Sequence, residues 1–171
     1  IRELNDVIQG KAEAPEVSEN DAATAYENIY EKFIKAAIVI ALTTGCVYGA
    51  ILLFQMGLQH SLYAVSRVLI ETHGHTQIFG WSGLFIMGVS YFVLPRFYAT
   101  PLYSGKLANL SFVFMITGIL LIFIFRSLLP VYDFSFFKIL IISGCLLEVF
   151  AVVFFLIVAF KTILSAEKQD T

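Results

Sequence analysis

This sequence carries little charge outside its first 35 residues. Half of its 11 basic and 13 acidic residues lie in residues 1–35, and the remaining residues share the other half. Charged residues make up 14% of the chain and hydrophobic residues 58%, whereas about 25% of a typical soluble chain is charged. Such a chain would aggregate in water, which excludes a soluble enzyme and a disordered regulator. The net charge of −2, without a basic stripe, excludes a nucleic-acid binder.

The sequence also lacks most motifs of enzyme chemistry. It contains no phosphate-binding loop, no nucleophile triad and no pair of catalytic carboxylates. Its two cysteines, Cys46 and Cys145, form no C-x-x-C motif, and we expect both to be small packing residues. The C-x-x-C-H signal for covalent haem attachment is missing too, so any haem would be a non-covalent haem b.

Long apolar runs are abundant, and they indicate a membrane protein. A bilayer core needs about 20 apolar helical residues, and a lipid-exposed backbone must be helical there. Four stretches meet that length: Phe33–Met56, His75–Leu94, Leu107–Phe125 and Ile139–Phe160. The sequence therefore predicts an all-α, polytopic four-helix transmembrane bundle over residues 33–165, in contact with the lipid bilayer.

The flanking segments are expected to be polar ends and turns. Residues 1–32 are acidic and predict an N-terminal arm, although residues 20–35 could instead form a helix capped by Ser18 or Asn20. Residues 166–171 predict a polar tail, and the Pro95–Pro101 segment predicts the end of the second span. Helical spacing of apolar residues predicts a short surface helix between the first two spans: Leu62, Val65, Val68 and Leu69.

Basic residues indicate the orientation in the membrane. With both termini on one side, that side holds eight lysines and arginines and the other holds three, Arg67, Arg126 and Lys138. Because cytoplasmic loops carry the excess of basic residues, we expect both termini to be cytoplasmic. We expect the membrane to be the inner membrane of a bacterium.

All three histidines lie between the end of the first span and the start of the second, which puts them near the outer face. They are His60, His73 and His75. Ligating groups at that depth are functional candidates, and the alternative is that they are interfacial residues bonded to water and headgroups. On a regular helix His73 and His75 point about 200° apart, so they are not expected to share a metal ion.

The face of the second span below His73 carries two glycines, Gly80 and Gly88. Glycines there leave room for a flat group such as haem, whose iron an imidazole ligates. Close packing of two helices is the competing explanation for both glycines.

Residues His73–Phe97 resemble the second helix of the catalytic subunit of haem-copper oxidases, most closely the C-type branch linked to cytochrome c and the related nitric oxide reductases. That helix opens with a histidine that ligates a low-spin haem. The family's Ile-Phe and Ser-Tyr-x-Val motifs match Ile78-Phe79 and Ser90–Val93, which Arg96 follows. The resemblance implies that His73 is the axial ligand, with His75 as the alternative in a shifted register. The His-x-His pattern also resembles the NnrS family of haem-binding membrane proteins.

The resemblance covers about 25 residues and implies only half of a low-spin haem site. The oxidases have about a dozen helices, and their other ligands lie in later helices, whereas no histidine follows His75 here. The second ligand would come from His60, from Met56, from a partner subunit or from a second copy of the chain. Arg67 and Arg126, predicted on the same side, are candidates to pair with haem propionates or are simple interfacial anchors.

Glu148 is the carboxylate expected near the middle of the fourth span. Burying a carboxylate is costly unless it is protonated or paired. A proton relay or a quinone contact is the functional interpretation, and a protonated side chain bonded to a neighbouring helix or subunit is the structural one.

These features predict a haem b-binding, non-catalytic subunit of a respiratory-type electron-transfer complex. Its expected partners are other membrane subunits, with cytochrome c or quinol as redox partners. One alternative is a structural or assembly subunit that shares the oxidase helix but has lost the cofactor. Another is an NnrS-like protein that responds to haem or nitric oxide.

Overall fold

The computed structural model describes residues 28–61, 63, 65–132 and 134–167. All regular elements of these residues are helical, and four helices are long and apolar enough to cross a membrane. Their bounds are Ile29–Leu58, Arg67–Phe97, Gly105–Leu128 and Ser135–Ala166. The chain is therefore an all-α, polytopic membrane protein, as the sequence predicts.

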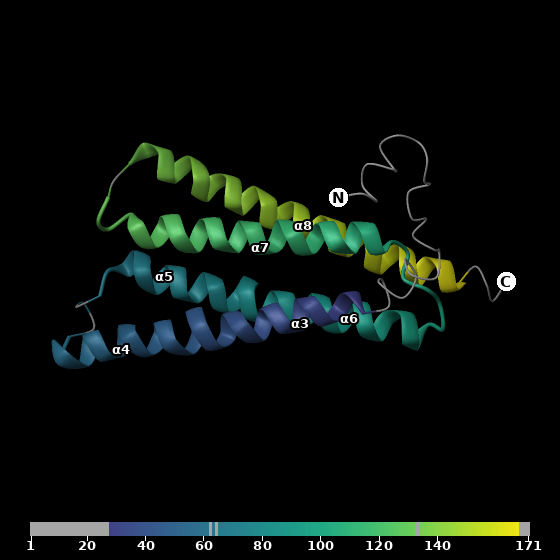
Figure 1. Ribbon diagram of the computed structural model, residues 1–171, viewed down its shortest axis with the longest axis horizontal. Helices are drawn as coiled ribbons and strands as arrows, with labels where there is room; N and C mark the ends of the chain where they lie inside the picture. The colour runs from purple at the N-terminus through teal and green to yellow at the C-terminus, as the bar shows by residue number, and fades with distance from the viewer. Residues whose placement is uncertain (1–27, 62, 64, 133, 168–171) are drawn as a thin grey trace, which may run out of the picture.

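The first two helices each contain a π-helical segment at their middle. The first helix joins α3 (Ile29–Ile40), η1 (Ala41–Val47) and α4 (Tyr48–Leu58), and the second joins α5 (Arg67–His75), η3 (Thr76–Gly83) and α6 (Leu84–Phe97). They are followed by α7 (Gly105–Leu128) and α8 (Ser135–Glu167). Figure 1 shows two helical hairpins side by side, with both ends of the described chain at the same end of the bundle.

The observed helices extend beyond the predicted spans at both ends. Because the second helix begins at Arg67, residues 67–72 form its first turns, and the prediction of a separate surface helix there is wrong. The helix ends at Phe97, two residues after Pro95, as the proline-rich segment predicts. The first helix begins at Ile29, so the last residues of the predicted arm are helical. The rest of the arm, including the predicted caps Ser18 and Asn20, lies outside the described residues.

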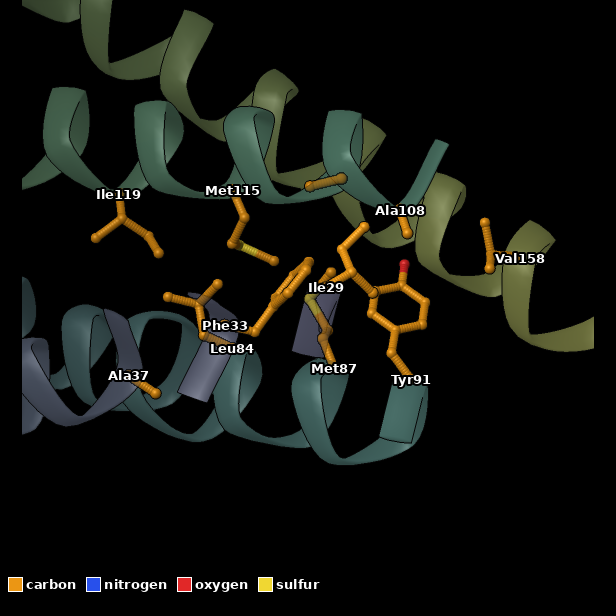
Figure 2. Packing of buried hydrophobic residues seen from close by; sticks show 11 residues of the cluster. Ile29, Phe33, Ala37, Leu84, Met87, Tyr91, Ala108, Met115, Ile119 and Val158 are labelled. Carbon is orange, nitrogen blue, oxygen red and sulfur yellow. The ribbon is translucent and has the colours of Figure 1, made fainter. Parts of the chain in front are cut away.

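The hydrophobic core lies toward the end of the bundle where the described residues begin and end. Phe33 from α3 is fully buried and points between α6 and α7 (Figure 2), with ring contacts to Tyr91 at 5.2 Å and Phe112 at 5.0 Å. The Tyr91 hydroxyl lies 3.1 Å from the Ser111 hydroxyl, which satisfies both polar groups inside the core. Leu84 and other apolar residues of all four helices complete the cluster.

Small residues bring α7 and α8 together. A Cβ atom added to Gly118 would lie 2.7 Å from the Gly144 carbonyl oxygen, so only glycine allows this approach. Cys46 and Cys145, by contrast, are exposed on the outside of the bundle. The prediction that the two cysteines are packing residues is wrong, because both lie on helix faces that point away from the other helices.

Candidate functional site

His73 lies in the last turn of α5 and points at the first helix. Its Nδ1 atom is 3.0 Å from the carbonyl oxygen of Thr44 in η1. A carbonyl oxygen only accepts hydrogen bonds, so Nδ1 carries the proton. In the neutral imidazole, the lone pair is then on Nε2. Metal-ligating histidines are oriented in this way, with the second ring nitrogen donating to a carbonyl or carboxylate.

The ring of His73 occupies the space that a side chain at position 49 would fill. A Cβ atom on Gly49 would lie 2.9 Å from His73 Cε1 and 3.2 Å from Nε2. The neighbouring ring of Tyr48 has its centroid 6.1 Å from that of His73. The Tyr48 hydroxyl is buried and has no hydrogen-bond partner among the described residues. An unpaired donor is therefore buried on the residue next to Gly49.

His75 points at a different helix, as the predicted angle between the two histidines requires. Its Nε2 atom lies 2.9 Å from Oε1 of Glu148 on α8. The Glu148 side chain is buried, at 5% exposed, and the His75 side chain is mostly buried, at 15% exposed. Glu148 is thus bonded to a side chain of a neighbouring helix, as its structural interpretation predicts. Because this contact uses Nε2 of His75, Nδ1 is the nitrogen left for any other ligand.

The two π-helical segments face each other next to His73 and His75. A side chain at Gly45 in η1 would collide with Gln77 in η3, so the segments touch through a glycine. Short π-helical stretches inside α-helices are frequent at functional sites, because they change which backbone groups are bonded and where side chains point. Here Thr44, whose carbonyl binds His73, lies inside such a segment.

Gly80 and Gly88 are used for helix packing. A Cβ atom on Gly80 would lie 2.8 Å from Ile40 Cγ2, and one on Gly88 would lie 2.8 Å from Phe33 Cβ. The first helix therefore fills the face on which a haem was expected to lie. Close packing, the competing explanation, accounts for both glycines in this structure.

The two arginines predicted near haem propionates both contact Glu71. Arg67 Nε is 2.8 Å and Arg126 Nη2 is 2.5 Å from its carboxylate oxygens. Glu71 was missed by the sequence analysis, although its spacing of four residues from Arg67 on a helix is a signal for such a pair. His60 is exposed in the turn after α4 and has a φ of 49°.

A haem fits part of this arrangement. The contact of His73 Nδ1 with the Thr44 carbonyl suits an axial ligand, and the space at Gly49 is filled by the His73 ring itself. The glycine face does not leave space for the haem ring, because side chains of the first helix fill it. The two arginines do not offer free contacts for haem propionates, because both already pair with Glu71. The sequence does not identify the Thr44 carbonyl as the partner of His73, because no sequence pattern predicts the π-helical segment that contains Thr44.

Comparison with known proteins adds no relative: no family model, no curated protein and no solved structure matches this chain.

Proposed function

We propose that this chain is a haem b-binding membrane subunit of an electron-transfer complex, with His73 as one axial ligand. The observation that carries the proposal is the hydrogen bond from His73 Nδ1 to the Thr44 carbonyl. It fixes the ring, selects the tautomer and leaves Nε2 as a ligating atom. A haem bound there would supply one-electron transfer. The chain itself contributes the ligand, its orientation and the water-poor surroundings.

The position of His73 supports a role near one membrane face. The residue lies six positions after the start of α5, which is about 9 Å along the helix. On the basic-residue argument this is the outer face, opposite cytoplasmic termini in a bacterial inner membrane. Electrons would then be exchanged there with a cytochrome c or a quinol.

We assign the second axial ligand to a partner subunit. His75 already contacts Glu148 through Nε2, and His60 is exposed in a turn. A histidine from another membrane subunit completes the site without disturbing either contact. If no partner subunit supplies the second ligand, His60 is the candidate from this chain, and its turn would have to rearrange for it to reach the haem iron.

The test is the absorbance spectrum of the native complex, purified from cells grown with excess haem. We expect a low-spin haem b spectrum in the native complex, lost in His73→Ala and kept in the His60→Ala control. If only His60→Ala loses the spectrum, the ligand is misassigned. A native complex with no haem assigned to this chain would refute the proposal.

A structural or assembly subunit is the second candidate. It is favoured by the filled glycine face and by the two satisfied charge clusters, Arg67–Glu71–Arg126 and His75–Glu148. These contacts form without a cofactor. Affinity purification from native membranes distinguishes the two functions: in a structural role, His73→Ala leaves both the partners and the haem content of the complex unchanged.

A further inference from the structure

An apolar groove lies between the first helix and α7. Its volume is about 290 Å³, and it is lined from Lys35 to Thr44 on one side and from Ile116 to Phe123 on the other. Val39 and Leu120, which line it, are 59% and 51% exposed, so the groove opens away from the bundle. In a membrane this opening faces lipid.

Two contacts between the same helices lie at the ends of the groove. At one end, Lys32 donates a hydrogen bond to Asn109, and its ammonium group lies 4.9 Å from the Phe112 ring centroid. At the other end, the rings of Tyr48 and Phe123 are 5.4 Å apart. From Lys35 to Thr44 the groove is about 14 Å long, which is about half of a bilayer core of roughly 30 Å. Its length thus matches one leaflet.

Among the residues that the structure describes, those at the Lys32 end carry a positive charge. Lys35 is 73% exposed and pairs with Glu31 at 2.6 Å. Lys32 bonds to the neutral side chain of Asn109, so this turn of the first helix keeps a net charge of one. Lys106, exposed at the start of α7, adds a second net positive charge at the same end of the bundle. Basic residues at a membrane surface attract anionic headgroups.

We propose that this groove binds one acyl chain of an anionic phospholipid, with the phosphate at Lys32 and Lys35. A helix is about 10–12 Å across, so a 14 Å length of it would fill roughly 1,100–1,600 Å³, far more than the groove offers. A single hydrocarbon chain is the narrow apolar occupant that remains. This site is independent of haem: its chain-binding wall includes Thr44, but the carbonyl of that residue faces His73 instead.

Native mass spectrometry of the full chain in neutral detergent tests the proposal. We expect phosphatidylglycerol to stay bound in preference to phosphatidylcholine. Lys35→Gln should lower the affinity for phosphatidylglycerol about fivefold, because one basic residue near an anionic surface is worth about 1 kcal/mol. Lys138→Gln, at the opposite end of α8, is the control and should leave that affinity unchanged.

A second pair of variants tests the groove itself. Ala36→Phe fills it, and Ala50→Phe adds the same ring on an exposed face of the same helix outside the groove. We expect at least a tenfold loss of phosphatidylglycerol binding for Ala36→Phe alone. If Ala36→Phe fails to fold, Val39→Phe on the exposed rim of the groove replaces it.

Three outcomes would overturn the proposal. If phosphatidylglycerol and phosphatidylcholine bind equally well, and Lys35→Gln changes neither affinity, the site does not recognise an anionic headgroup. Displacement of bound lipid by a neutral prenyl quinone would make the groove a quinone-tail site. A dimer that Ala36→Phe alone dissociates would identify the occupant as a second copy of the chain.

Discussion

The two halves of the bundle are built differently. In the core half, formed by α3, α6 and the turns of α7 and α8 that pack on them, the buried residues include large apolar side chains such as Phe33, Leu84 and Met87. In the histidine half, formed by α4, η1, α5 and η3, α4 buries only Leu52 and η1 only Gly45, whereas α5 and η3 bury Thr72, Thr76 and Gly80. The first half is built for packing, and the second positions polar side chains.

In this bundle, the residues that pack the helices together and the residues suited to binding lie in different halves. Close packing is one of the main forces that hold helices together in lipid, so we expect the core half to contribute more of the stabilisation. The histidine half holds the π-helical segments and the histidine–carboxylate pair. Substitutions in the two halves should therefore have different effects, on stability in one and on binding in the other.

The largest expected effect is in the core half. Phe33→Ala should lower the free energy of unfolding by about 3 kcal/mol, because it leaves a cavity between three helices. Reversible unfolding in mixed detergent micelles measures this change. Phe54→Ala, on a residue of α4 that is 67% exposed, is the matched control and should change stability little. Equal losses for the two variants would mean that the halves do not differ in packing.

The next largest effect concerns the buried pair of the histidine half. Glu148→Leu should cost about 2 kcal/mol, because His75 is left buried without its partner. The double variant with His75→Leu should recover part of that loss, and a double-mutant cycle measures the coupling. Additive losses would show that the two side chains do not interact in the membrane.

A glycine substitution separates binding from stability. Gly49→Ala places a methyl group 2.9 Å from His73 Cε1, so the ring must shift and the haem content should fall severalfold. The free energy of unfolding should change by less than about 1 kcal/mol. Gly57→Ala, in the same helix with no atom within 4 Å of the added methyl group, should keep the haem content. An unchanged haem content in both variants would show that Gly49 plays no part in positioning the haem ligand.

The smallest effect is expected for the surface charge cluster. Arg126→Gln removes one of the two arginines on Glu71, whose side chain is 41% exposed, so the loss of stability should be small because solvent screens the pair. Thermal unfolding at low and high salt checks it, because screening should remove most of the difference. A loss that persists at high salt would indicate a packing role for Arg126.

Much of the fold follows from the sequence, and less of the site does. Hydropathy predicts four spans because the bilayer fixes their length, and helix geometry predicts that His73 and His75 contact different helices. The partners of those histidines, Thr44 and Glu148, depend on which helices lie side by side, which periodicity does not determine. The resemblance to oxidases remains a prediction that bears on His73 alone.

The most direct test of the central proposal is electron paramagnetic resonance of the oxidised protein purified in its native complex. We predict a low-spin ferric haem signal that is lost, or replaced by a high-spin signal, in His73→Ala. The same low-spin signal, unchanged in amplitude and position after this substitution, would contradict the assignment of His73 as an axial ligand.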